Sequence, residues 1–117
     1  EIVVITGDRI SAHSSNRSIR TKFLGKDAKF PYGVFLIAAL LDCPTYFCFG
    51  LRDAPVMLRP VNAVYMHRSD IDFNGCSRNE RNERINRLCE NYVMTLEKYC
   101  MRFPNQWYNF YDFWSEE

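Results

Sequence analysis

The order of apolar and polar positions along the 117-residue chain predicts six elements in the order β-β-α-β-β-α. A β-branched run at 2–6 favours a strand buried on both faces, and the alternation at 20–24 favours a second strand. The apolar run at 45–51 predicts a central strand, and 56–66 predicts a fourth strand with an interruption at Pro60. We therefore expect one domain over 1–117, of the α/β class, with a small mixed β-sheet flanked by helices.

Two segments have the spacing of helices. In 33–42, Leu36, Ala39 and Leu40 share one face, and Pro44 prevents the helix from continuing. Ser77 and Glu80 have the spacing of a capping box at the start of a helix over 77–103. Its apolar positions recur every three or four residues, at Ile85, Leu88, Cys89, Tyr92, Leu96, Tyr99 and Phe103. Residues 10–19, 25–29, 52–55 and 71–77 are expected to be loops or turns.

An aromatic tail follows the second helix. Six of the eleven residues from Pro104 to Trp114 are Trp, Tyr or Phe. Each ring can remove roughly 150–250 Å² from water, so the tail is expected to fold onto a body, a membrane or a partner. Two interpretations remain open: a terminal segment that seals the core, or an aromatic wall beside a lipid-handling cleft.

Composition and charge narrow the classes of partner. The net charge of +1 gives no reason to expect a nucleic-acid partner, and the densest run of aromatic residues lies at the C-terminal end of the chain. The first thirty residues carry a modest excess of Arg and Lys, which is compatible with anionic groups nearby. The longest apolar run, 34–41, is far shorter than the roughly 20 residues that cross a bilayer. Any membrane contact is therefore expected to be peripheral.

The five cysteines form neither a CxxC pair nor a Cys/His ligand spacing. Their odd number predicts reduced thiols, a cytoplasmic chain and no metal site. Cys43 and Cys48 lie in apolar surroundings and are expected to be small core residues rather than nucleophiles. Glycine-rich nucleotide-binding and zinc-protease motifs are absent from the sequence, so no cofactor is expected.

Polar side chains at three places in the sequence could take part in catalysis or ligand binding. His67 and Asp72 have the His-x-x-x-x-acid spacing of a base and the carboxylate that orients it, but the spacing is favoured as coincidence. His13 is expected to be a solvated loop residue. Asp8 and Arg9 come just after the first predicted strand, where α/β sheets bind ligands, and Arg suits a phosphate or carboxylate. A structural turn formed by this Asp–Arg pair is an equal alternative.

Several short motifs together resemble one family. They lie at 7–9, 23–25, 28–31, 36–44, at Tyr92 with Leu96 and Glu97, and at 104–114. In this order they resemble the predicted acyltransferases of the lysophospholipid acyltransferase superfamily, relatives of the bacterial late lipid A acyltransferases. The ending Pro104-Asn-Gln-Trp-Tyr-Asn-Phe-Tyr-Asp-Phe-Trp114 is the most specific part, and 10–19 and 67–78 show little resemblance.

The resemblance implies transfer of an acyl group from an acyl carrier protein or acyl-CoA donor to a lipid precursor. It implies a peripheral enzyme on the cytoplasmic side of the bacterial inner membrane. Carried over by position, Asp8, Arg9, Phe23 and Gly25 would line or support the acceptor cleft, Pro44 would shape it, and Gln106 and Trp107 would belong to its terminal aromatic segment. The expected substrate-binding residues are Asp8, Arg9, Phe23, Gly25 and Trp107.

The sequence differs from the family's pattern in the place of the catalytic residues. The family's catalytic His-x-x-x-x-acid pair precedes the segment that matches 7–9, which here lies almost at residue 1. We therefore expect the chain to be the C-terminal part of such an enzyme, inactive alone, and to expose strand edges that favour a homo-oligomer. The alternative is a non-catalytic lipid- or protein-binding module.

Overall fold

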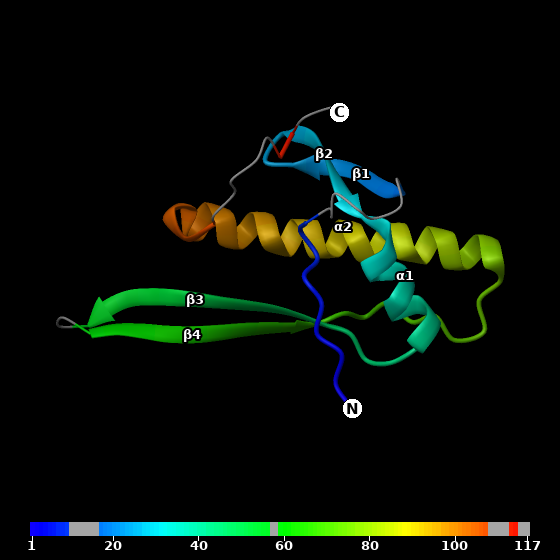
Figure 1. Ribbon diagram of the computed structural model, residues 1–117, viewed down its shortest axis with the longest axis horizontal. Coiled ribbons are helices and arrows are strands. Elements are labelled where there is room, and N and C mark those ends of the chain that lie inside the picture. The colour runs from blue at the N-terminus through cyan, green and yellow to red at the C-terminus, as the bar shows by residue number, and fades with distance from the viewer. Residues whose placement is uncertain (10–16, 57–58, 108–112, 115–117) are drawn as a thin grey trace.

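The computed structural model describes residues 1–9, 17–56, 59–107 and 113–114. For residues 53–56 and 59–61 it describes the backbone only. The described elements follow the order β1, β2, α1, β3, β4, α2 and a short 3₁₀ helix η1 (Figure 1). Residues 10–16 of the predicted loop at 10–19, including His13, and tail residues 108–112 lie outside the described residues, and residues 18 and 19 of that loop belong to β1. The α/β class is therefore confirmed, with a different arrangement of strands.

Strands β1 (Ser18–Phe23) and β2 (Lys26–Pro31) form an antiparallel hairpin. Its two-residue turn places Leu24 at φ 52° and Gly25 at φ 87°, the left-handed pair that matches the twist of the strands. Ile19, Phe23, Ala28 and Phe30 alternate onto the buried face. The predicted strand at 20–24 thus corresponds to the last four residues of β1 and the first turn residue. The predicted turn at 25–29 is wrong beyond Gly25, because 26–29 pair with β1 as part of β2.

Helix α1 (Tyr32–Leu41) follows Pro31 directly and ends at Asp42, whose N–H donates to the Ala38 carbonyl oxygen. Its left-handed end (φ 45°) and Pro44 close the helix as expected. The predicted face is only partly correct, because Ala39 is buried whereas Leu40 is 62% exposed. Tyr32 links the helix to α2 by donating from its hydroxyl to the Asn82 side chain at 3.2 Å.

Strands β3 (Tyr46–Val56) and β4 (Arg59–Arg68) form a second antiparallel hairpin. β3 runs through the predicted turn at 52–55, where the register instead shifts between Asp53 and Val56. β4 begins before Pro60, so the expected interruption does not divide the strand. The prediction that 45–51 is a central strand is wrong, because β3 pairs only with β4 in the described part of the chain.

Helix α2 (Arg78–Arg102) matches its prediction closely. The Ser77 side chain accepts from the Glu80 N–H at 3.3 Å, and the Glu80 carboxylate accepts from the Ser77 N–H at 3.2 Å. Ile85, Leu88, Cys89, Val93, Leu96, Tyr99 and Cys100 form its buried side. η1 (Pro104–Gln106) turns the chain away from the helix.

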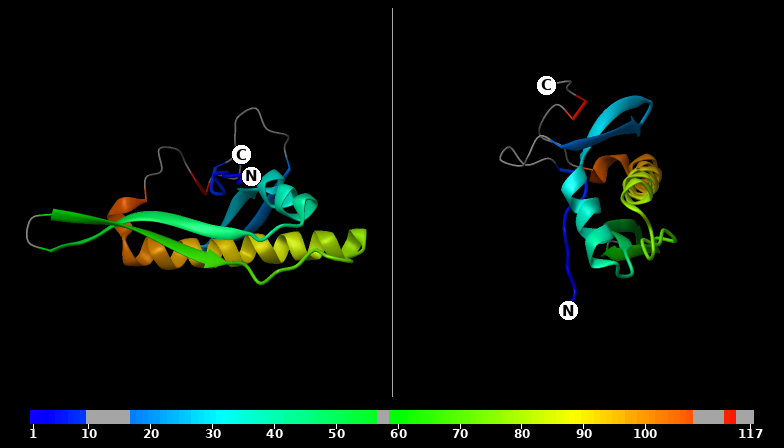
Figure 2. Two further views of the ribbon diagram at one scale, coloured as in Figure 1. Left: turned by 90° about the horizontal axis from the view of Figure 1, so that it is seen from below. Right: turned by 90° about the vertical axis from the view of Figure 1, so that its right-hand side faces the viewer.

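The two hairpins lie on different sides of α2, and α1 bridges them (Figures 1 and 2). The molecule is elongated along α2, with extents of 53 × 34 × 25 Å. The strands therefore form two separate antiparallel sheets, not the expected single mixed sheet. One side of α2 is apolar and wide enough to contact both hairpins, so each sheet packs on the helix instead of pairing with the other.

Two further expectations are corrected. Residues 2–6 form no strand, and Ile2 is 91% exposed, because no neighbouring strand in the described structure offers them hydrogen bonds. Cys43 and Cys48 are exposed rather than buried. Cys43 lies in the connection after α1, and Cys48 lies on the face of the β3–β4 hairpin that is turned away from α2, where β-alternation leaves apolar side chains uncovered.

Candidate functional site: an aromatic cluster with a basic hairpin face

Phe23 is the centre of an aromatic cluster between the first hairpin and the tail. Its side chain is 0% exposed. Its ring centroid lies 5.2 Å from that of Trp107, 5.5 Å from Phe113 and 5.9 Å from Trp114. The Trp114 indole N–H donates to the Phe23 carbonyl oxygen at 3.1 Å. The expectation that the tail packs onto the domain is therefore confirmed for its described residues.

Trp107 differs from Trp114 in its polar end. The Trp107 indole nitrogen is buried, and no hydrogen-bond acceptor reaches it from the described residues. A buried indole N–H usually has a hydrogen-bond partner, and an external acceptor would reach this one only after the packing around it opened. The rest of the Trp107 side chain is half-buried, packed edge-on against Phe23 and Phe113.

Gln106 fixes the start of the tail to the second hairpin. Its side-chain oxygen accepts from the Arg52 N–H, and its side-chain N–H₂ donates to the Arg52 carbonyl oxygen, both at 2.6 Å. The side-chain amide thus imitates the peptide group of a neighbouring strand. This pair of bonds holds Trp107, the next residue, in place relative to β3.

Tyr92 extends the aromatic contacts across α2. Its ring centroid lies 6.5 Å from Phe30 and 5.8 Å from Phe35 on one side, and 5.4 Å from Phe47 and 6.1 Å from Phe49 on the other. Because Phe30 also contacts Phe23 at 5.9 Å, the contacts are continuous from the tail to β3. Tyr92 is the residue through which both hairpins and α1 meet.

The segment at 7–9 reaches the same residue. A Cβ atom on Gly7 would lie 3.0 Å from the Tyr92 ring, so only glycine fits without a shift of the ring. Burial raises the pKa of the Tyr92 hydroxyl well above its usual range, and the nearby Asp8 carboxylate adds to the effect. Asp8 therefore lies within electrostatic reach of α2, a contact that the sequence pattern did not indicate.

The buried cysteines of α2 are poor nucleophiles. Burial, with a contribution from Asp8, raises the pKa of the Cys100 thiol to about 11. Burial, with a contribution from Glu90, raises the pKa of the Cys89 thiol to about 12. Because the thiolate is the reactive form, neither group is poised for thiol chemistry near neutral pH.

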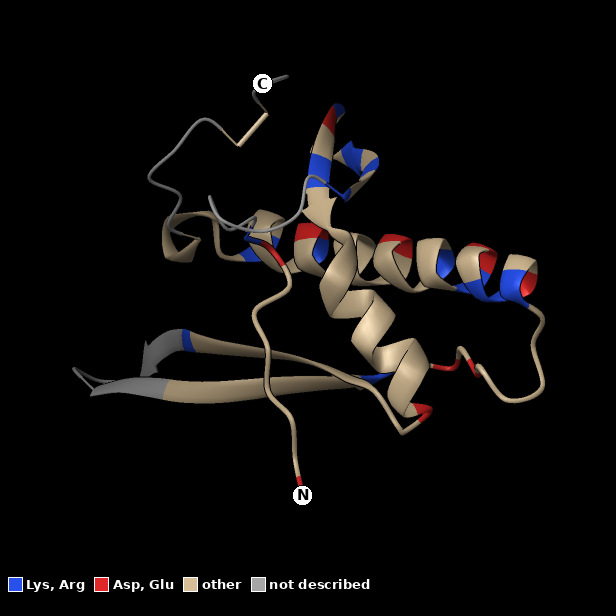
Figure 3. Ribbon diagram, turned by 45° about the vertical axis from the view of Figure 1, so that its right-hand side comes forward, with Lys and Arg blue, Asp and Glu red and all other residues tan. Residues whose placement is uncertain are grey.

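The outward face of the first hairpin is basic. Arg20 and Lys22 alternate away from the core on β1, and their cross-strand neighbours on β2 are Lys29 and Asp27 (Figure 3). Arg20 stands directly opposite Lys29, an unfavourable pairing of like charges. The exposed Arg20 and Lys22 side chains give this face groups suited to phosphate or carboxylate.

The structure brings only some of the predicted site residues together. Phe23 and Trp107 are in contact, and Gly25 lies in the turn just beyond Phe23. Asp8 lies instead beside Tyr92, with Arg9 exposed next to it. Pro44 is exposed in the connection between α1 and β3. The direct contact of these residues with a substrate stays a prediction, and the full burial of Phe23 points to a supporting role.

His67 and Asp72 have different partners in the structure. The Nε2 atom of His67 shares a hydrogen bond with the Tyr99 hydroxyl, which joins β4 to α2. The Asp72 carboxylate accepts from the Asn74 N–H at 2.9 Å, and the backbone carbonyl oxygen of Asp72 accepts from the Arg84 guanidinium at 2.7 Å. The two side chains therefore do not form a base and orienting acid in this structure.

No group of three or more His, Cys, Asp or Glu side chains is arranged to hold a metal ion in the part of the chain that the structure describes. Of the described helices, none combines the length and apolar character that crossing a membrane requires. Comparison with protein-family models, with curated proteins and with solved structures finds no match to this chain.

Proposed function

We propose that this chain is the C-terminal part of an acyltransferase that moves an acyl group from a carrier thioester, with acyl carrier protein the favoured donor, to a lipid precursor. In this proposal, the chain supplies the binding surface for the lipid acceptor, and the proton-abstracting histidine is supplied by a preceding segment. The enzyme works as a peripheral protein on the cytoplasmic face of a bacterial inner membrane.

One observation carries the proposal. The sequence segments that resemble the acyltransferases are far apart in the chain, yet residues from most of them contact one another in space. Phe23, Phe30, Tyr92 and Trp107 form consecutive ring contacts, and Gly7 lies against Tyr92. This convergence supports the proposal, because a shared functional region brings residues from distant segments together.

The chemistry of the region suits a lipid acceptor. The half-buried Trp107 ring offers an apolar contact for an acyl chain. Arg20 and Lys22 on the adjoining hairpin offer cations for a phosphate head group. Each Lys or Arg near an anionic membrane surface contributes about 1 kcal/mol to binding.

An activity assay tests the enzymatic part of the proposal. The 117-residue chain, alone and joined to its natural preceding sequence, is incubated with acyl carrier protein carrying a labelled acyl group and with a bacterial lipid extract. We expect label in lipid only for the extended chain, and at least a ten-fold loss for Trp107→Ala. Met101→Ala, at an exposed apolar position of α2, is the matched control and should keep full activity. Robust transfer by the 117-residue chain alone, or none by the extended chain, would overturn the proposal.

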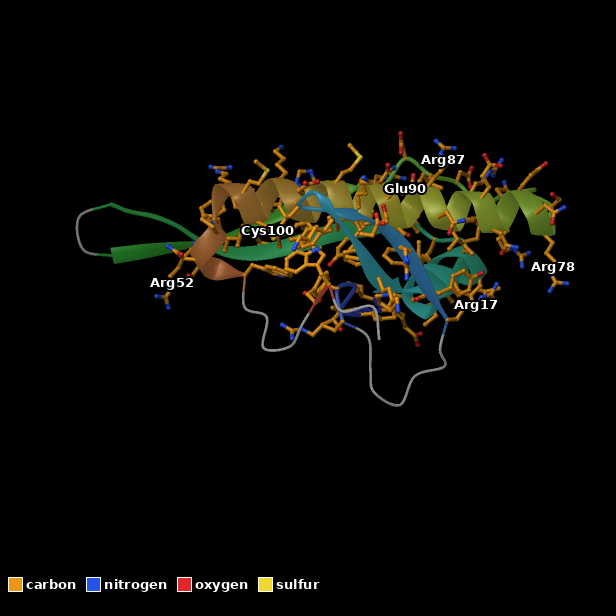
Figure 4. All side chains as sticks on the ribbon, turned by 90° about the horizontal axis from the view of Figure 1, so that it is seen from above. Arg17, Arg52, Arg78, Arg87, Glu90 and Cys100 are labelled. Atoms are coloured by element: carbon orange, nitrogen blue, oxygen red, sulfur yellow. The ribbon has the colours of Figure 1, made fainter. Side chains whose placement is uncertain are left out.

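A vesicle assay tests the basic face separately. We expect the chain to sediment with vesicles containing phosphatidylglycerol and not with neutral phosphatidylcholine vesicles, and salt should weaken the binding. The double variant Arg20→Glu with Lys22→Glu should weaken it at least ten-fold. Arg87→Glu is the control, since Arg87 points away from the body on α2 (Figure 4). Binding by the extended chain without any acyl transfer would favour the alternative of a non-catalytic lipid-binding module.

A further inference from the structure

The edge of β3 that faces away from β4 has backbone groups to which another strand could bind. The Ser69 N–H donates to the Thr45 carbonyl oxygen at 2.8 Å, so odd-numbered residues of β3 direct their backbone groups toward β4. Arg52 directs its backbone groups the other way, toward Gln106. By the same alternation, Tyr46, Cys48 and Gly50 point their N–H and C=O groups outward, and no described residue pairs with them.

The segment at 2–6 also lacks a partner strand in the described structure. Residues 2–6 are apolar or β-branched and extended, and Ile2 and Val4 are 91% and 88% exposed. The segment leaves the body at Gly7, which is held against Tyr92, and runs away from it as an arm (Figure 2). In its own chain the arm crosses in front of the second hairpin at the start of β3 (Figure 1), and its described residues form no backbone hydrogen bond with β3.

We propose that the arm at 2–6 of one copy adds as a strand to the β3 edge at 46–50 of a second copy. Both segments are five residues long, and Gln106 already occupies the edge at Arg52, which sets the end of the free stretch. Two copies that exchange arms satisfy both edges in a closed, two-fold symmetric dimer. With the segments aligned centre to centre, Val4 of one copy lies opposite Cys48 of the other.

This alignment is testable because Cys48 is a free, exposed thiol. Directly opposed residues of paired strands have Cα atoms about 4.5–5.5 Å apart, which a disulfide can bridge. In a Cys43→Ser background, Val4→Cys is oxidised and analysed on a non-reducing gel with peptide mapping. We expect a dimer linked between positions 4 and 48 that disappears when Cys48→Ser is added. Met101→Cys, at a 72% exposed position of α2, is the control for random collisions.

A second measurement does not depend on oxidation. Sedimentation velocity of the unmodified chain should show a dimer. Gly50→Pro removes one outward N–H without removing a bond to β4 and should weaken dimerisation at least ten-fold. Val64→Pro makes the same change at the opposing position on the β4 edge and should leave it unchanged. A monomeric chain, a disulfide within one chain, or cross-linking no greater than that of Met101→Cys would overturn the proposal. None of these outcomes depends on acyl transfer.

Discussion

Truncation of Phe23 tests the central contact of the structure. The variant Phe23→Ala removes a ring that is fully buried against Phe30, Trp107, Phe113 and Trp114. Removing about 150 Å² of apolar area at about 25 cal/mol per Å² costs about 4 kcal/mol. That value falls within the range of about 3–5 kcal/mol for Phe→Ala changes in cores. Since small domains have only about 5–15 kcal/mol of stability, the loss is a large fraction of the total.

Two spectroscopic signals locate the effect. The only tryptophans of the chain, Trp107 and Trp114, both contact Phe23, so intrinsic fluorescence reports on the tail and first hairpin. Far-ultraviolet circular dichroism reports mainly on α2. In urea titrations of Phe23→Ala, both signals should shift together to lower urea if the domain unfolds as one unit.

Two further variants calibrate the measurement. Phe23→Leu keeps most of the volume and should cost about 1.5 kcal/mol. Leu40→Ala, at a position that is 62% exposed, should change the free energy of unfolding by less than about 0.5 kcal/mol. A cost below about 1 kcal/mol for Phe23→Ala would refute the central role of Phe23. An unchanged fluorescence transition in that variant would show that the tail does not pack on it.

Three other changes have expected outcomes. Ser77→Ala removes the capping box and should destabilise the domain by about 1 kcal/mol, measured by thermal circular dichroism. Gly25→Ala places a side chain at φ 87° and should cost about 1–2 kcal/mol in the same experiment, with no loss expected only if the turn rearranges. At about pH 8, iodoacetamide should modify the exposed Cys48 at least ten-fold faster than Cys100, as read by peptide mass spectrometry. Because folding raises the pKa of Cys100 from 9.0 to about 11, its contribution to stability is complete below pH 9.0 and is lost as the pH rises toward 11.

The elements with local signals were predictable, and those that depend on distant partners were not. Helix α2 follows from the Ser77–Glu80 spacing and a helical period, both of which are read within a few residues. The run at 2–6 has strand propensity, but a strand also needs a neighbour, and the described structure provides none for it. An apolar stretch such as 45–51 does not reveal how many of its faces or edges are covered.

The same limit applies to the candidate site. The tail could be predicted to fold back onto the domain because most of its aromatic residues lie close together in the sequence. The site at which the tail attaches to β3 could not be predicted. Gln106 binds the backbone of Arg52, and because backbone groups are the same at every position, the sequence does not single out Arg52 as the partner. The proximity of Asp8 to Cys100 joins opposite ends of the chain and has no counterpart in spacing or composition.

The shared use of α2 restricts how this chain can vary in length. Phe49 of β3 contacts both Tyr92 and Tyr99, which are seven residues apart and therefore lie about two turns apart on one side of the helix. One inserted residue between them would rotate everything beyond it by about 100° and turn Tyr99 away from β3. Loops can lengthen without such a penalty. Homologues of this chain should therefore differ in length at their loops, while insertions or deletions between positions 92 and 99 should be rare.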